Sequence, residues 1–289
     1  MIENIFGNYL TDKGIMSKDA LKNVLKKQDG ARVKMGLMAV AEGMMTVAQS
    51  DEVNRLQAVM DQRFGDIAVG KGYLTEEQVG VLLKKQGNAY LSFVQAILDE
   101  GLMSMEDVSA AFDAFATENG YSQEQKEDLK SDDPEKIVPI ILPSRLSDYE
   151  KIVATVVKSV IRLIDRHAYI GKATSTEDFP TEKQVNQSMM GDNGLVDGFE
   201  EGDGGLLKVA SVFCKEYFET IDDFALDSAG EFLNCANGIF VSALSRQGSF
   251  LELMPPNYDA VMYRMKDGSI CKVPIFVGDH YFNLVIASI

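Results

Sequence analysis

Hydrophobic and polar positions repeat with a fixed period in the first half of the chain. A glycine recurs every 29 residues, and each is followed by two apolar residues and then a hydroxyl residue. The four glycines are Gly14, Gly43, Gly72 and Gly101. Such a glycine is typical of a left-handed helix end, and the hydroxyl residue is typical of the N-cap of the next helix. The pattern predicts four helix-turn-helix units within residues 1–122.

The third unit carries a more specific pattern, with Arg63 and Gly65 ahead of Gly72 and apolar residues after it. It resembles the repeat in the N-terminal domain of type II secretion and type IV pilus assembly ATPases. In some of those domains two successive copies bind cyclic di-GMP. Ile5, Lys34 and Ser92 stand where the other units would need the arginine. The alternatives are therefore a nucleotide-binding module and a module for helix packing or adaptor contacts.

A charge-rich stretch follows the repeats. Residues 123–136 contain the run Ser131-Asp132-Asp133-Pro134, and a run of this kind is typical of a linker. We therefore predict a charged linker over residues 123–146. A capping box at Ser147 and Glu150 then predicts the first helix of a second domain, residues 147–289. Its apolar face is Ile152, Val156, Val160, Leu163 and Ile164.

The rest of the second domain is expected to combine helices with a sheet. Strand-like stretches lie at 208–213, 250–254, 261–265, 270–277 and 281–286. The turn Lys266-Asp267-Gly268-Ser269 is typical of antiparallel strands. The acidic, glycine-rich segment 189–205 does not fit the EF-hand template and is interpreted as a hairpin loop. We predict an α+β protein: an all-helical repeat domain, followed by an α/β domain with long helices packed on a largely antiparallel sheet.

Glu231 and Asn234 are the candidate site residues. They are three residues apart in a stretch that also holds Phe232, Leu233 and Phe240, so a helix would bury the apolar residues and turn the polar pair outward. Glutamate can pair with a lysine or arginine. Asparagine can orient a water molecule without taking its proton. Orientation of this kind serves the in-line attack of water on a phosphoryl group.

The pair lies within a longer pattern of Asp227, Gly230, Glu231, Asn234 and Gly238. This pattern resembles the signature helix of the CheC/CheX/FliY family of chemotaxis phosphatases, and the resemblance covers about half of the chain, from Ser147 to Ile289. The segment ending in Pro255-Pro256 also follows at the distance where the family has a strand ending in proline.

The resemblance implies a function and a partner. The substrate would be the phospho-aspartate of a CheY-like response regulator in two-component signalling. Glu231 would pair with the regulator's lysine, and Asn234 would position the hydrolytic water. The protein would need no cofactor of its own, because Mg²⁺ is supplied by the response regulator. A second Glu-x-x-Asn is absent from an equivalent helix, since Val153 is three residues after Glu150. The chain is thus CheX-like, which implies a homodimer.

Composition narrows the other possibilities. A net charge of −16 argues against a nucleic acid partner. No apolar run reaches the length of a membrane span, and the first residues do not form a signal peptide, so we expect a cytoplasmic protein without membrane insertion. Cys214, Cys235 and Cys271 are expected to be buried thiols. His167 and His280 are too isolated for a zinc site and are expected to be partly buried.

Two classes of function remain for the second domain. The first is a protein phosphatase, a hydrolase acting on a phosphorylated regulator. The alternative is a non-catalytic adaptor that binds a response regulator or a secretion or pilus component, with cyclic di-GMP sensing by the N-terminal repeats as a further option.

Overall fold

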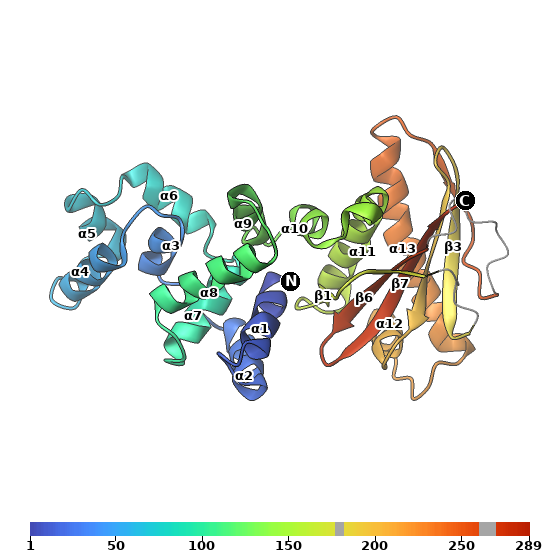
Figure 1. Cartoon of the computed structure of the whole chain (residues 1–289), viewed down its shortest axis with the longest axis horizontal. Coiled ribbons are helices and arrows are strands. Elements are labelled where there is room, and N and C mark those ends of the chain that lie inside the picture. The colour runs from blue at the N-terminus through green and yellow to red at the C-terminus, as the bar shows by residue number, and fades with distance from the viewer. Residues whose placement is uncertain (177–181, 260–269) are drawn as a thin grey trace. The chain divides into compact units, whose positions relative to one another are not determined.

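The computed structural model describes residues 1–176, 182–259 and 270–289. Within them the chain forms two compact units, Ile2–Asp132 and Asp133–Ile289 (Figure 1). The first unit is built from helices, and the second combines helices with a seven-stranded, antiparallel sheet. The predicted α+β class is confirmed.

The first unit consists of helix pairs joined by short turns. The helices are α1 (Ile2–Asp12), α2 (Lys18–Gln28), α3 (Met35–Ala41), α4 (Val47–Gln57), α5 (Phe64–Gly70), α6 (Glu76–Lys84), α7 (Ala89–Asp99), α8 (Met105–Glu118) and α9 (Gln123–Leu129). Every repeat glycine has a positive φ, between 64° and 73°, and lies between the two helices of a pair. The hydroxyl residues Ser17, Thr46, Thr75 and Ser104 each cap the second helix of the pair. The four predicted helix-turn-helix units are confirmed.

The same turn occurs once more, outside the 29-residue period. Gly120 has a φ of 71°, and Ser122 forms a capping box with Gln125 at the start of α9. Within the described residues only one helix, α8, lies between Gly101 and Gly120, whereas two helices separate each successive pair of repeat glycines, so the spacing here is 19 residues (120 − 101) and not 29. A search by fixed spacing therefore misses this turn.

Segment 123–146, for which the sequence predicts a charged linker, is largely helical. It contains α9, α10 (Pro134–Ile141) and the start of the 3₁₀ helix η1 (Ser144–Tyr149). The two units divide inside it, between Asp132 and Asp133. Helix α10 forms because Asp133 caps it and Pro134 occupies its first turn. Its residues Ile137 and Val138 are buried.

The next helix, α11 (Glu150–Leu163), begins differently from the prediction. Ser147 lies inside η1, and the N-cap of α11 is Tyr149, which makes no side-chain capping bond. The predicted capping box is therefore wrong: Glu150 is the first residue of the helix, not its third. The predicted apolar face is largely buried, but Leu163 is exposed.

The sheet of the second unit has the strand order β1-β6-β7-β4-β3-β5, with β2 paired to β6. The strands are β1 (Tyr169–Ile170), β2 (Thr174–Thr176), β3 (Gln184–Gly191), β4 (Leu195–Glu201), β5 (Leu251–Leu253), β6 (Ile270–Val277) and β7 (His280–Ser288). Predicted strands 250–254, 270–277 and 281–286 are confirmed as β5, β6 and β7. Predicted strand 261–265 and the turn at 266–269 lie outside the described residues.

Two other predictions for this unit need correction. Residues 208–213 are not a strand but part of helix α12 (Gly205–Cys214), whose buried residues Leu206, Val209 and Ala210 follow helical spacing. Segment 189–205 holds a hairpin turn, as interpreted, but the turn is confined to residues 192–194 between β3 and β4. Both strands of that hairpin were missed.

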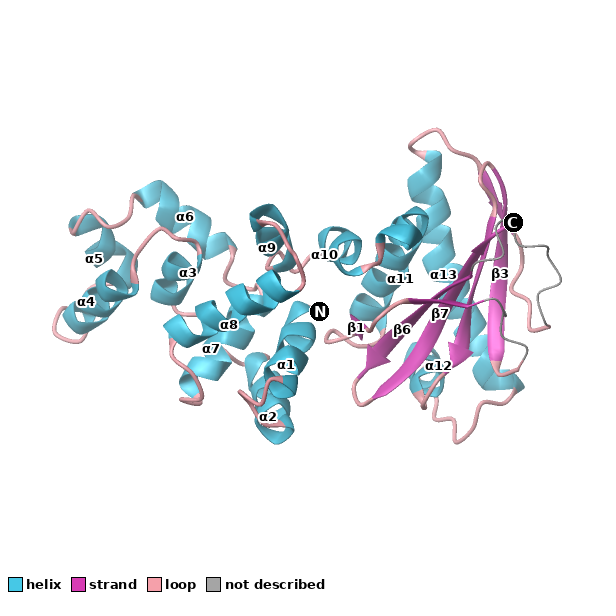
Figure 2. Cartoon of the chain, in the orientation of Figure 1, coloured by secondary structure: helices cyan, strands magenta, loops and turns pink. Residues whose placement is uncertain are grey.

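Helices α12 and α13 (Asp223–Ser245) cover one face of the sheet, with α11 beside α13 and α10 against α11 (Figure 2). Aromatic rings fill the space between α13 and the sheet. The rings of Phe199 and Phe232 lie 5.8 Å apart between centroids, and those of Phe199 and Phe282 lie 5.1 Å apart. This packing sets the distance of α13 from the sheet and the rotation of α13 about its own axis. Helix α13 carries the candidate site.

Candidate functional site

Helix α13 presents the predicted pair on its outer side. Asp222 caps the helix by accepting a hydrogen bond from the backbone N–H of Ala225 at 2.9 Å. The buried residues of α13 include Ala225, Ala229, Phe232, Leu233, Ala236 and Phe240. Asp227, Glu231 and Asn234 follow one another at helical spacing along the other side. The Asp227 and Glu231 side chains are exposed, and Asn234 is partly exposed.

The glycine before Glu231 has a steric reason. A Cβ atom at Gly230 would lie 2.8 Å from the hydroxyl oxygen of Tyr258 and 3.2 Å from a methyl carbon of Val185. Tyr258 crosses the helix at this point, and its hydroxyl donates a hydrogen bond to Asp227 Oδ1 at 2.9 Å. Gly230 thus lets the segment after β5 approach α13 closely. The last glycine of the pattern differs: a Cβ at Gly238 would meet no described atom within 4 Å.

Tyr258 was not among the predicted site residues. Burial, the hydrogen bond to Asp227 and the nearby charges of Asp227 and Glu231 raise the pKa of Tyr258 to about 12. It therefore remains a protonated donor at neutral pH. One sequence signal could have pointed to Tyr258. The residue comes directly after Pro255, Pro256 and Asn257, the segment that continues the β5 edge strand.

The side chain of Asn234 is hydrogen-bonded to a residue of the sheet. Gln187, on β3, donates a hydrogen bond from Nε2 to Asn234 Oδ1 at 2.8 Å. This bond takes one lone pair of the amide oxygen and leaves the second lone pair and both Nδ2 hydrogens. Among the described residues, no acceptor contacts Asn234 Nδ2. The residue therefore combines an anchored oxygen with an amide group that a ligand can contact.

The charge at this face is negative and uncompensated. In the described part of the chain, neither Asp227 nor Glu231 forms an ion pair with a lysine or arginine. Beside them is a hollow of about 400 Å³ lined by Asp223, Phe224, Leu226, Asp227 and Tyr258. The Phe224 side chain is 78% exposed. The face thus offers acceptors for a cationic side chain next to exposed apolar surface.

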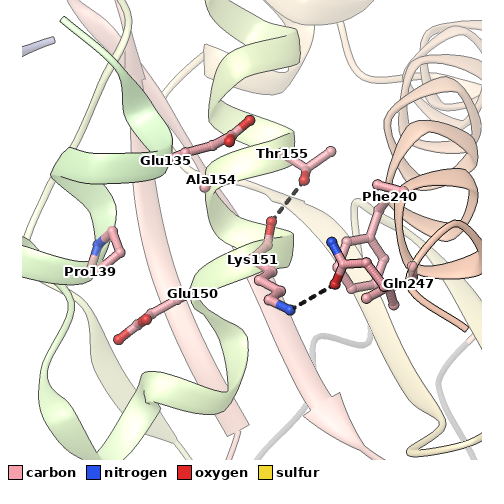
Figure 3. Close-up of a pocket in the computed structure, with 10 residues that line it drawn as sticks. Glu135, Pro139, Glu150, Lys151, Ala154, Thr155, Phe240 and Gln247 are labelled. Atoms are coloured by element: carbon pink, nitrogen blue, oxygen red, sulfur yellow. Dashed lines mark hydrogen bonds between the residues drawn. The ribbon is translucent and has the colours of Figure 1, made fainter. Parts of the chain in front are cut away.

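A second cleft, of about 360 Å³, lies between α10, α11 and the C-terminal end of α13 (Figure 3). Lys151 donates a hydrogen bond to Gln247 Oε1 at 3.2 Å across it, and Phe240 lines its wall. None of the residues in the predicted pattern lines this cleft. Of its charged groups, Glu135 is paired with Lys158 and Lys151 is bonded to Gln247.

The cysteine and histidine expectations hold only in part. Cys271 is buried, and burial raises the pKa of its thiol to about 12. Cys214 and Cys235 are exposed, so the prediction of three buried thiols is wrong for these two. Both lie on outward turns of α12 and α13. His167 is partly buried as expected, whereas His280 is exposed and contacts the carbonyl oxygen of Asp203 at 2.8 Å.

No group of three or more His, Cys, Asp or Glu side chains that could hold a metal ion occurs within residues 1–176, 182–259 and 270–289. Across the same residues, none of the helices combines the length and the apolar character that spanning a membrane requires.

Comparison with known proteins gives similar structures for the second half of the chain. No protein-family model matches the sequence, and a comparison with curated proteins gave no match. A CheC-like superfamily protein from Shewanella sp. PV-4 is 16% identical, with a TM-score of 0.41, over 48% of this chain and 95% of that chain. The chemotaxis protein CheX from Desulfovibrio desulfuricans is 12% identical, with a TM-score of 0.41, over 49% and 98% of the two chains.

A chain of the CheX–CheY–BeF3–Mg²⁺ complex from Borrelia burgdorferi is also similar. It is 18% identical, with a TM-score of 0.39, over 48% of this chain and 96% of that chain.

Proposed function

We propose that the second unit promotes hydrolysis of the phospho-aspartate of a CheY-like response regulator. The observation that carries the proposal is the outer side of α13, where exposed Glu231 lies one turn from the partly exposed, anchored amide of Asn234. This is the arrangement that the resemblance to the chemotaxis phosphatases requires.

In this reaction the oxygen of a water molecule forms a bond to phosphorus. The bond between phosphorus and the aspartate oxygen breaks, the aspartate leaves as a carboxylate, and a water proton passes to solvent or to the phosphate product. Asn234 cannot take that proton. Its free lone pair and Nδ2 hydrogens can instead hold the water and a phosphoryl oxygen in line. An acyl phosphate already hydrolyses readily in water, so correct placement of the attacking water is enough to accelerate the reaction.

Glu231 has the second role, docking. Its carboxylate is exposed and has no cationic partner among the described residues, so it can pair with the lysine of the regulator's active site. The Mg²⁺ of the reaction belongs to the phosphorylated regulator, so this chain supplies no cofactor. The exposed Phe224 and the adjoining hollow add apolar contact area around the polar pair. The homodimer and a cytoplasmic location belong to the same proposal.

The experiment is a phosphate-release assay with a panel of phosphorylated CheY-type receiver domains and Mg²⁺. The proposal predicts that the full chain shortens the phosphorylated lifetime of at least one receiver. A non-catalytic adaptor would bind a receiver, detected by calorimetry with its beryllofluoride complex, and leave that lifetime unchanged. Binding without acceleration would therefore replace the hydrolase with the adaptor.

A further inference from the structure

Three fully buried polar side chains lie between α13 and the sheet. They are Gln187 on β3, Asp197 on β4 and Asn237 on α13, and each has 0% exposure. We refer to these three residues as the buried polar cluster. Phe199, two residues from Asp197 on β4, lies on the same face of the sheet and stacks on Phe232 of α13, so the cluster is set into an apolar layer. Burying polar groups in such a layer costs free energy unless hydrogen bonds replace the lost water.

The hydrogen bonds of the cluster connect Asp197, through Asn237 and Gln187, to Asn234. Asn237 donates from Nδ2 to Asp197 Oδ1 at 2.7 Å and to Gln187 Oε1 at 3.0 Å. Gln187 donates from Nε2 to Asn234 Oδ1 at 2.8 Å and to the carbonyl oxygen of Met254 at 2.7 Å. Both amide nitrogens thus use both of their hydrogens. The series begins at a buried carboxyl group and ends at the amide of Asn234.

These bonds permit one orientation of each amide. If the Gln187 amide turned over, its oxygen would face two other oxygens, those of Asn234 and Met254, and its nitrogen would face the nitrogen of Asn237. Asn237 is fixed in turn because Asp197 Oδ1 accepts one of its hydrogens. The orientation of the Asn234 amide is therefore set by residues that never reach the surface.

The cluster is not optimal for stability. In the described part of the structure, Asp197 Oδ2 and Asn237 Oδ1 are buried without a hydrogen-bond partner. Partly satisfied buried polar groups are less favourable than an apolar core of the same volume. Stability alone therefore does not account for the cluster, whereas its connection to Asn234 does.

We infer that Gln187 is a positioning residue for the hydrolysis, holding the Asn234 oxygen so that the Asn234 amide nitrogen faces the bound phosphoryl group, with Asn237 and Asp197 fixing Gln187. The inference rests on the proposed function. Gln187 itself does not touch the substrate. It acts by limiting Asn234 to one side-chain orientation before the regulator docks. The entropy cost of ordering that side chain then does not add to the barrier of the reaction.

The test compares Gln187→Met with Gln184→Met in the full chain. Gln184 is a matched control: it is on the same strand, is 2% exposed, and donates from Nε2 to two carbonyl oxygens, of Tyr258 and Asp259. Its odd spacing from Gln187 places it on the opposite face of the sheet. Both changes remove a buried amide of equal size, and only one removes the support of Asn234.

Two readouts are needed. The first is the heteronuclear NOE of the Asn234 side-chain NH2 group, identified by its loss in Asn234→Ala. It requires no regulator. The second is the kinetics of receiver dephosphorylation. We expect Gln187→Met to lower the NOE and to reduce kcat roughly tenfold, the effect of one hydrogen bond, at unchanged KM. Gln184→Met should leave the NOE of the Asn234 NH2 group unchanged.

Gln187→Glu serves as a second variant in case the methionine protein does not fold. A glutamate carboxylate cannot donate to Asn234 Oδ1, so the Asn234 amide should turn and donate to it, again with loss of kcat. Equal NOE values and equal kcat for the Gln187 and Gln184 variants would overturn the inference. If Asn234→Ala leaves phosphate release unchanged, the proposed function fails instead, and the NOE alone decides whether Gln187 orders Asn234.

Discussion

Glu231 and Asn234 differ in how firmly their side chains are held. Asn234 is bonded to Gln187 behind it, whereas no described residue constrains the Glu231 carboxylate. This difference suits two tasks. A water-positioning group needs a fixed orientation before binding, while a docking group gains its partner only in the complex. We therefore expect substitutions of the two residues to separate in kinetics.

Glu231→Lys should weaken docking and leave the chemical step nearly intact. The change places a cation against the lysine of the regulator, so KM should rise about tenfold to a hundredfold with a smaller effect on kcat. Glu124→Lys, an exposed acid on α9, makes the same change in net charge and is the control. A fall in kcat at constant KM for Glu231→Lys would contradict the docking role.

Asp197 gives the protein a pH-dependent term in its stability. Burial is the main cause that raises the pKa of Asp197 to about 7, against about 4 in an unfolded chain. The folded state thus binds this proton more tightly. The stabilising contribution is complete below about pH 4 and is lost as the pH rises through about 7.

The difference between Asp197→Asn and the native protein isolates that contribution. The variant should gain stability relative to the native chain as the pH rises from about 4 to about 7, by a few kcal/mol at most, with little further change above. Urea unfolding at a series of pH values measures this. A stability difference that stays constant over the whole range would show that Asp197 does not titrate near neutrality.

At the scale of elements, the site depends on the close approach of α13 and the segment after β5. Gly230→Ala should force Tyr258 to move, breaking its bond to Asp227, at a cost of about 1–3 kcal/mol. In a Tyr258→Phe background, where the hydroxyl is absent, the cost should be smaller. Gly238→Ala, on the same helix with open space around it, should stabilise the protein by about 0.5–1 kcal/mol.

Thermal or urea unfolding of Gly230→Ala, Tyr258→Phe, their double variant and Gly238→Ala measures this set. If Gly230→Ala costs the same with and without the Tyr258 hydroxyl, Tyr258 is not the reason for the glycine.

Elements defined by local signals could be predicted from the sequence. The turns at Gly14, Gly43, Gly72 and Gly101 could be predicted because each combines two local signals. A positive φ favours glycine, and the next helix begins with a hydroxyl cap three residues later. Strands β3 and β4 were missed because buried polar residues such as Gln187 and Asp197 interrupt the expected apolar alternation. Helix α12 was assigned as a strand because a short apolar run does not distinguish the two.

At the scale of the whole molecule, the sequence indicated two units, and Glu231 and Asn234 lie on one helix, α13. The division inside 123–146 was harder to predict, because capping groups turn a charged segment into α9 and α10. The support of Asn234 could not be predicted, since Gln187 is 47 residues away and meets it only through the pairing of sheet and helix. Long-range contacts of this kind leave no periodic signal.

In the proposed reaction, Asn234 places the water that hydrolyses a phospho-aspartate. The most direct measurement is phosphate release from a phosphorylated CheY-type receiver with the native chain, Asn234→Ala, and Ser242→Ala as an exposed control on the same helix. The account predicts that Asn234→Ala returns the rate to that of the receiver alone while binding persists, and that Ser242→Ala keeps the native rate. Full stimulation by Asn234→Ala would contradict it.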